Sequence, residues 1–108
     1  MYIYNIFGYN WIESKKETFR EAVIEAIKND EDFCSLDLSH KDLRNVDFRG
    51  VDLSGSDLTE SYLKGADFRG ANLYKVDLCG ANLRRAFFDE SQLKDLIKGM
   101  HINISNAK

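Results

Sequence analysis

Leucine or phenylalanine occupies every fifth position of the chain over most of its second half. The row has twelve members: Leu38, Leu43, Phe48, Leu53, Leu58, Leu63, Phe68, Leu73, Leu78, Leu83, Phe88 and Leu93. A helix repeats its apolar face every 3.6 residues and a strand every second residue, so a period of five fits neither. A short fixed period indicates a solenoid, in which each repeat buries its apolar side chain only by stacking on its neighbours.

The residues around each Leu or Phe also repeat. A small or β-branched residue stands two positions before it, Asp or Asn stands one position before it, and Gly often stands two positions after it. We expect the large and small apolar residues to point inward and the Asp or Asn to face water. Glycine suits the positions where the backbone turns sharply.

A stretch such as GADFRGANLYKVDLCGANLRRA resembles the pentapeptide-repeat family. The resemblance covers residues 33–95 and implies a mainly β fold, a right-handed four-sided β-helix in which each repeat forms one side. Four repeats then make one coil, and the chain has about three coils. The same scaffold serves many roles, so the resemblance leaves the function open.

Residues 1–32 are expected to form a cap on the first coil. Residues 15–28 have a helical apolar stripe, and two capping boxes precede it, Ser14 with Glu17 and Thr18 with Glu21. Residues 1–7 show a short strand pattern. The aromatic residues of this region are interpreted as packing against the helix and coil, with a partner surface as the alternative; they are Tyr2, Tyr4, Phe7, Tyr9 and Trp11.

Residues 96–108 are expected to form a C-terminal cap or a dimerisation tail. Residues 91–98 favour a short helix that stops at Gly99, and Met100, Ile102 and Ile104 then alternate with polar residues. Some family members dimerise through this end, so the resemblance suggests a homodimer contact here. An intramolecular cap is the alternative. The three parts together are expected to form one compact domain.

A period of twenty places residues of successive coils in columns on four faces. One face carries Asp37, Asp57 and Asp77, with Glu60 at its corner, and no Lys or Arg. The next face is basic, with Arg44, Lys64, Arg84 and Arg85. The third face is mixed and the fourth is mostly neutral. The Asp column has two interpretations, a functional acidic surface or turn-forming residues that bond to their own backbone.

The functional interpretation of the acidic face is DNA mimicry. Several pentapeptide-repeat proteins resemble duplex DNA and occupy the DNA site of gyrase, and duplex DNA carries one charge per about 3.4 Å of each strand. Three coils span only about 15 Å, which favours a compact inhibitor over a gyrase-length rod. We expect a phage or mobile-element protein that blocks a DNA-binding host protein or complex, such as a nuclease, a restriction enzyme or a CRISPR effector. A gyrase- or topoisomerase-interacting protein is the alternative.

Two further hypotheses use other surfaces. A generic protein-interaction module would use the outward aromatic residues Tyr62, Tyr74 and Phe87, although Tyr62 and Phe87 also suit contacts with a helix or the tail. Direct nucleic-acid binding along the basic face is the least favoured, because the net charge is −3. Lys41 stands where an inward residue is expected, which predicts an irregular first coil.

The sequence argues against catalysis, cofactors and metals. His40 and His101 lie far apart, and no Cys or His spacing suits a metal ion. Glycines at five-residue intervals are typical of repeated turns and do not match the spacing of a phosphate-binding loop. We therefore expect no cofactor. No stretch is long and apolar enough for a membrane span, and no signal peptide is evident. Cys34 and Cys79 are expected to be free thiols in a reducing cytoplasm.

Overall fold

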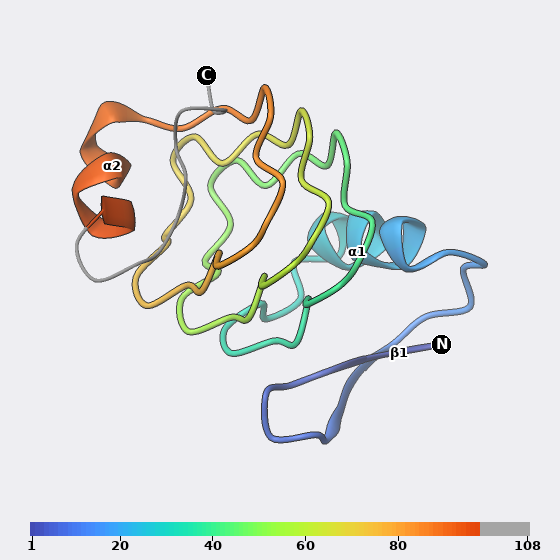
Figure 1. The fold of residues 1–108 in the computed structure, drawn as a ribbon. Helices are drawn as coiled ribbons and strands as arrows, with labels where there is room; N and C mark the ends of the chain where they lie inside the picture. Colours follow the sequence, from blue (N-terminus) through green and yellow to red (C-terminus); the bar gives the residue numbers. More distant parts are fainter. Residues whose placement is uncertain (98–108) are drawn as a thin grey trace.

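The computed structural model describes residues 1–97. Four elements occur along the chain: strands β1 (Tyr2–Tyr4) and β2 (Asn10–Glu13), then helices α1 (Phe19–Lys28) and α2 (Glu90–Ile97). Between the two helices the backbone winds in stacked turns, with the hairpin and α1 at one end and α2 at the other (Figure 1). The predicted C-terminal strand pattern and homodimer contact fall on residues 98–108, outside the described residues.

The stacked turns repeat every twenty residues. Parallel bridges join residues twenty apart on all four sides: Asp37 to Asp57 to Asp77, Asp42 to Tyr62 to Asn82, Asp47 to Asp67 to Phe87, and Asp52 to Asn72. Each bridge is supported by backbone hydrogen bonds, such as that from the N–H of Leu58 to the carbonyl of Asp77 at 2.8 Å. The coil of four five-residue sides that the sequence predicts is therefore present, and the bridges extend as far as Phe87.

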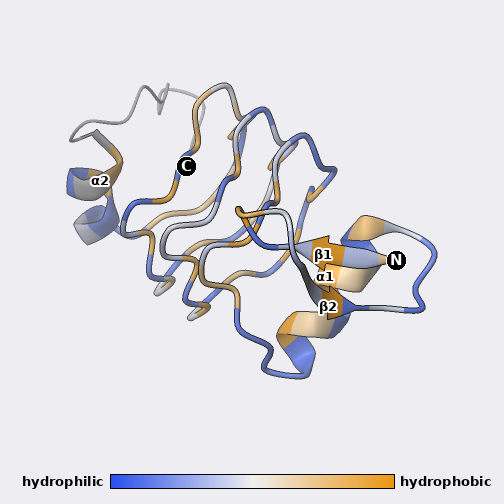
Figure 2. Ribbon diagram, turned by 90° about the horizontal axis from the view of Figure 1, so that it is seen from below, coloured by the Kyte–Doolittle hydropathy of each residue, from blue (hydrophilic) through white to orange (hydrophobic). Residues whose placement is uncertain are grey.

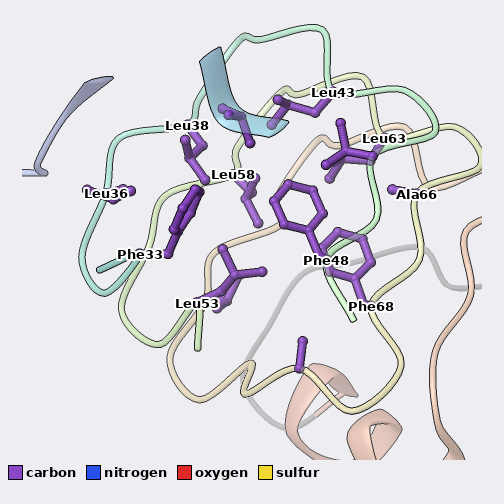
Figure 3. Packing of buried hydrophobic residues seen from close by; sticks show 14 of the residues in the cluster. Phe33, Leu36, Leu38, Leu43, Phe48, Leu53, Leu58, Leu63, Ala66 and Phe68 are labelled. Carbon is purple, nitrogen blue, oxygen red and sulfur yellow. The ribbon is translucent and has the colours of Figure 1, made fainter. Parts of the chain in front are cut away.

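The Leu and Phe row fills the interior of the coils. Its members from residue 38 to residue 83 are at most 3% exposed, and Phe88 and Leu93 are partly buried against the same core. Residues twenty apart stack directly on one another, as Phe48 and Phe68 do in Figure 3. Their ring centroids are 5.2 Å apart and nearly parallel, and Phe88 continues the stack at 5.1 Å. The apolar side chains thus gain from burial and from ring stacking along the solenoid axis.

The corners of the coils adopt a left-handed backbone at every fifth residue. Glycines occupy five of these corners from residue 50 to residue 80, at φ of 73° to 75°. Residues with side chains take the remaining corners, and among them His40, Glu60 and Lys75 have φ of 56° to 58°. The fold therefore imposes the left-handed conformation at every corner, including the corners that have no glycine.

An antiparallel hairpin of β1 and β2 covers the first coil. Tyr2 pairs with Glu13 and Ile3 with Ile12, and a bulge then leaves Trp11 as the extra residue before Tyr4 pairs with Asn10. Ile3 and Ile12 are buried and face the core. The strand expected over residues 1–7 is shorter than predicted, and its partner β2 had no sequence prediction.

Helix α1 begins later than the sequence predicts. The prediction of a helix from residue 15 is wrong, because the second capping box is the one that forms: Thr18 is the N-cap, and its Oγ1 accepts from the N–H of Glu21 at 3.1 Å. Ser14 instead donates from Oγ to Glu25 at 2.8 Å. The buried face of α1, formed by Ala22, Val23 and Ala26, belongs to the same apolar core as the interior of the coils.

The predicted irregularity of the first coil is limited to one turn at Lys41. From Val46 to Ala86, the N–H at this repeat position donates to the carbonyl three residues earlier, and Lys41 forms no such bond within residues 1–97. Its carbonyl accepts the ladder hydrogen bond from the N–H of Tyr62 at 2.9 Å, and the adjacent bridge of Asp42 to Tyr62 is regular. The Lys41 ammonium lies 4.8 Å from the ring centroid of Phe19 in α1. The long side chain thus leaves its inward position by passing between the coil and the helix.

Helix α2 closes the last coil. Gln92 leaves the outward column that the twenty-residue period assigns to it and is 8% exposed. Its Nε2 donates to the carbonyl of Phe68 at 2.6 Å and to the carbonyl of Ala71 at 2.9 Å. Gln92 thus supplies a donor to the carbonyl of Ala71 and a second donor to that of Phe68, which also accepts from the N–H of Ala71. Leu96 of α2 is fully buried in the same core. The predicted helix at residues 91–98 is confirmed with small shifts of its ends.

Candidate protein-binding surface

The acidic face predicted from the sequence, formed by Asp37, Asp57, Asp77 and Glu60, exists as one column with a corner residue. The three aspartates stack through parallel bridges. Glu60 is exposed at the corner and lies over the next coil, because a Cβ built on Gly80 would meet its Oε1 at 2.6 Å. The structure therefore brings these four side chains onto one side of the solenoid, in the order that the period of twenty predicts.

Each aspartate of this column also stabilises its own turn. Oδ1 of Asp37 accepts from the N–H and Oγ of Ser39, and Oδ1 of Asp57 accepts in the same way from Thr59. Oδ1 of Asp77 accepts from the N–H of Cys79 at 3.0 Å. The same bond to the second following residue occurs on the other faces, including those of Asn72 and Asn82. The turn-forming interpretation of the Asp or Asn position is thus confirmed, and it needs only one side-chain oxygen.

The faces differ in how the aspartate charge is compensated. Asp42, Asp47 and Asp67 each form an ion pair with the arginine two residues later, at N–O distances of 2.6 to 2.8 Å. Within residues 1–97, the aspartates of the acidic face form no ion pair, because Ser, Thr and Cys follow them at that position. The acidic face therefore keeps its negative charge.

The mixed face forms a ladder of alternating charge. Arg49 pairs with Asp47 at 2.8 Å and reaches Asp67 in the next coil at 3.8 Å. Arg69 continues the ladder, since it pairs with Asp67 and lies 5.1 Å from the ring centroid of Phe87. Hydrogen bonds from the arginines hold the pKa of Asp47 and of Asp67 below the ordinary value for Asp.

The basic face is less basic at its first coil than the sequence suggests. Arg44 donates from Nε and Nη2 to both carboxylate oxygens of Asp42, each at 2.8 Å. These hydrogen bonds lower the pKa of Asp42 from 3.8 to about 2. Arg20 of α1 also donates to the carbonyl of Arg44 at 2.6 Å. The first of the four cations predicted on this face, Arg44, is therefore paired with the carboxylate of Asp42.

The three aromatic residues of the predicted interaction patch lie on different faces. Tyr62, Tyr74 and Phe87 are 56%, 59% and 41% exposed. They belong to three different columns of the ladder, so they form no single patch. Lys75 lies 5.5 Å from the ring of Tyr74, as Arg69 does beside Phe87. Neither helix covers Tyr62, so its contact with a helix is not present among the described residues.

The largest set of exposed aromatic side chains lies on the N-terminal hairpin. Its members, which we call the aromatic hairpin, are Tyr2, Tyr4, Phe7, Tyr9 and Trp11, and they are 40% to 73% exposed. The interpretation that they pack against helix and coil is wrong, because Ile3 and Ile12 take the inward positions of the strands. The sequence contained the signal: alternation in a strand places Tyr2 and Tyr4 opposite Ile3.

The loop of this hairpin is held by one asparagine. Oδ1 of Asn5 accepts from the N–H of Phe7 at 3.0 Å and of Tyr9 at 3.1 Å. Gly8 adopts a φ of 87° between them. The loop that carries the two most exposed rings is therefore an ordered turn.

Other kinds of site have little support in the described part of the chain. No group of three His, Cys, Asp or Glu side chains there is arranged to hold a metal ion. Neither helix has the length and apolar character that crossing a membrane requires. Cys34 is half-buried and Cys79 is exposed, and both are free. Burial and the nearby Asp32 and Asp52 raise the pKa of the Cys34 thiol against the opposing effect of its contact with Ser54.

Stacked five-residue sides around an apolar interior, with a different set of side chains on each face, define a β-helical solenoid. The family model of pentapeptide repeats matches residues 32–65 and 61–95 with eight copies. The chain belongs to the pentapeptide-repeat family.

Comparisons with individual proteins add little beyond the family. No curated protein matches the chain. A crystal structure of a pentapeptide repeat protein from the cyanobacterium Cyanothece 51142 matches with 28% identity and a TM-score of 0.29. The match covers 50% of this chain and 40% of that one. The present chain thus corresponds to less than half of the length of that solved relative.

Proposed function

We propose that the protein is a non-catalytic binding module whose acidic face occupies the DNA-binding surface of a partner protein. The observation that carries this proposal is the uncompensated charge of Asp37, Asp57 and Asp77, which fill one column, on a scaffold where Asp42, Asp47 and Asp67 pair with arginine. A solenoid does not need this arrangement, since like charges in adjacent coils repel by about 1 kcal/mol or less in water.

The spacing of the acidic face supports this proposal. Columns in a β ladder advance by about 4.8 Å per coil, while each strand of duplex DNA has one phosphate charge per about 3.4 Å. The turn bonds occupy Oδ1 of each aspartate, and Oδ2 accepts no hydrogen bond from residues 1–97 in this column. A row of carboxylates that each keep one oxygen without a hydrogen bond from residues 1–97 has the sign and approximate density of a short phosphate row.

The length of the ladder limits the proposed target. Three stacked aspartates span about 10 Å, which suits a compact DNA-binding groove. We therefore propose a nuclease, a restriction enzyme or a CRISPR effector as the target, and a phage or mobile element as the setting. A gyrase or another topoisomerase remains the alternative target, with contact over a small part of its DNA-binding surface.

Competition with duplex DNA tests this function. The tagged protein is used to capture partners from a bacterial lysate, and the bound proteins are challenged with increasing concentrations of duplex DNA. We expect a DNA-binding partner that duplex DNA displaces in a saturable manner. A partner that stays bound at DNA concentrations that saturate its own DNA site would contradict the mimicry.

A second candidate function is a protein-interaction module that uses exposed aromatic residues of the coils. Tyr62 is 56% exposed although it stands where the repeat has Asp or Asn, and this observation favours it. Substitution of Tyr62→Asn restores the repeat pattern. A loss of partner capture in Y62N, with normal thermal unfolding, is the result that this second function predicts.

A further inference from the structure

The aromatic hairpin extends the sheet that carries the acidic face. Asn5 forms an antiparallel bridge with Leu36. The N–H of Asp37 donates to the carbonyl of Tyr4 at 2.8 Å. The ladder therefore continues from the three coils into β1 and on to β2 without a gap, and Figure 2 shows the hairpin at the end of the stack.

Side chains alternate across this sheet, so the outward face of the hairpin adjoins the acidic face. Leu36 and Ile3 point to the core and are fully buried. Asp37 follows Leu36 and Tyr4 follows Ile3, so alternation directs both of these side chains outward. Tyr4 is 44% exposed. Trp11, the extra residue of the bulge next to the buried Ile12, is 51% exposed, so its ring lies outside the core.

We infer that the acidic face and the hairpin residues Tyr2, Tyr4 and Trp11 form one docking surface for an extended, arginine-rich segment of a partner protein. This inference rests on the proposed function and adds the chemistry of the partner. Carboxylates attract cationic side chains, and exposed aromatic rings bind a cation over their face. Arginine meets both requirements better than lysine, because its planar guanidinium stacks on rings and pairs with carboxylates through two hydrogen bonds.

The protein already uses this chemistry within its own solenoid. Arg69 pairs with Asp67 of its own coil and stacks on Phe87 of the next coil, 5.1 Å from the ring centroid. Tyr4 and Asp37 have the same relation, an aromatic ring and a carboxylate in adjacent positions of one column, and no arginine of residues 1–97 pairs with this Asp. The missing member of this arrangement is the cation, which we assign to the partner.

The spacing of the surface fits an extended segment with arginine at alternate positions. From Tyr4 through the aspartates to Asp77 the column spans about 14 Å, and residues i and i+4 of an extended chain lie about 13 Å apart on one face. Three arginines separated by single residues match the whole column. A base-stacking single strand of DNA also suits exposed aromatic rings, but its phosphates would face the acidic column.

Trp11 is the only tryptophan of the chain, so its fluorescence reports on the hairpin half of the surface. The probes are a labelled peptide of four Arg-Ala repeats, the matching Lys-Ala peptide and a labelled single-stranded oligothymidine. We expect the Arg-Ala peptide to change the Trp11 emission and to bind about fivefold more tightly than the Lys-Ala peptide. Binding of oligothymidine with a change in Trp11 emission would overturn the inference in favour of nucleic acid.

Substitutions separate the inference from the function on which it rests. Tyr4→Ser should weaken Arg-Ala binding about fivefold, while Tyr74→Ser, which removes an exposed ring from another face, should leave it unchanged. Asp57→Asn with Asp77→Asn should weaken both peptides. If only the aspartate variants lose affinity, the acidic face binds cations but the hairpin does not, and the inference fails alone. If the aspartate variants bind as the unmodified protein does, the acidic face itself is inactive and the proposed function fails too.

Discussion

The backbone N–H of Asp37 donates a hydrogen bond of 2.8 Å to the carbonyl oxygen of Tyr4. This bond joins the N-terminal hairpin to the first coil and covers a solenoid end that would otherwise expose unpaired backbone groups. It also places an aromatic side chain beside an uncompensated carboxylate. The hairpin therefore closes the fold with its inward side and presents aromatic rings with its outward side.

Two adjacent residues of β1 should separate these roles in stability measurements. Ile3 is fully buried, so Ile3→Ala should lower the free energy of unfolding by about 2–5 kcal/mol. Tyr4 is 44% exposed, and Tyr4→Ala should cost much less. Urea unfolding followed by circular dichroism measures both changes. Equal losses would contradict the assignment of the aromatic hairpin to binding.

Gln92 should be essential for the closure of the last coil. Gln92→Ala leaves the carbonyl of Ala71 without a donor and removes one of the two donors to the carbonyl of Phe68, which still accepts from the N–H of Ala71. The expected loss in the free energy of unfolding is about 2 kcal/mol. Lys94→Ala, on the same helix but exposed, is the control and should change little. If Gln92→Ala lost no more stability than Lys94→Ala, the hydrogen bonds of Gln92 would not stabilise this end of the solenoid.

The left-handed corners should respond to substitution in opposite directions. Lys75 has a φ of 56°, so Lys75→Gly should raise the free energy of unfolding by about 1 kcal/mol. Gly80→Ala should lower it by at least about 1 kcal/mol, because φ is 75° and the new Cβ would meet Glu60 Oε1 at 2.6 Å. Thermal unfolding of both variants measures the two changes. A stabilised Gly80→Ala variant would contradict the corner geometry.

The pair of Asp42 and Arg44 predicts a specific acid sensitivity. The pKa of Asp42 is lowered to about 2, so its ion pair stabilises the fold above about pH 4, and this contribution is lost as the pH falls toward 2. Both partners are about half exposed, which limits the effect to the small contribution of a surface ion pair. Asp42→Asn and Arg44→Gln should each flatten the decrease of stability between about pH 5 and pH 2.5. An unchanged slope in both variants would exclude the pair as its source.

The regular part of the fold could be predicted because one residue type at one period determines it. The Leu and Phe row predicts the interior, and the same row at twenty residues predicts the Asp37 column and its bridges. The position of the Asp or Asn residues also predicts their turn bonds. Each of these features depends on contacts that repeat along the chain, so each is visible in the sequence as a repeat.

The ends of the solenoid could not be predicted in the same way, because the contacts that form each end occur only once and leave no repeat in the sequence. Gln92 occupies a repeat position but leaves its column to pair the last carbonyls. Lys41 keeps its bond in the ladder to Tyr62 while its ammonium lies over the ring of Phe19 in α1. Alternation in β1 places Tyr4 opposite Ile3, but the pairing of this strand with the first coil, which turns Ile3 toward the core, has no repeating signal.

Matched charge variants test the central claim most directly, which is that the acidic face binds a partner through its own carboxylates. One variant carries Asp→Asn at positions 37, 57 and 77, and the other carries Asp→Asn at positions 42, 47 and 67. Both have the same net charge, and asparagine keeps the turn bond, as Asn72 and Asn82 do. Affinity for the captured DNA-binding partner is measured for both. We predict a loss of at least about tenfold in the first variant only. Equal affinities of the two variants would contradict the claim.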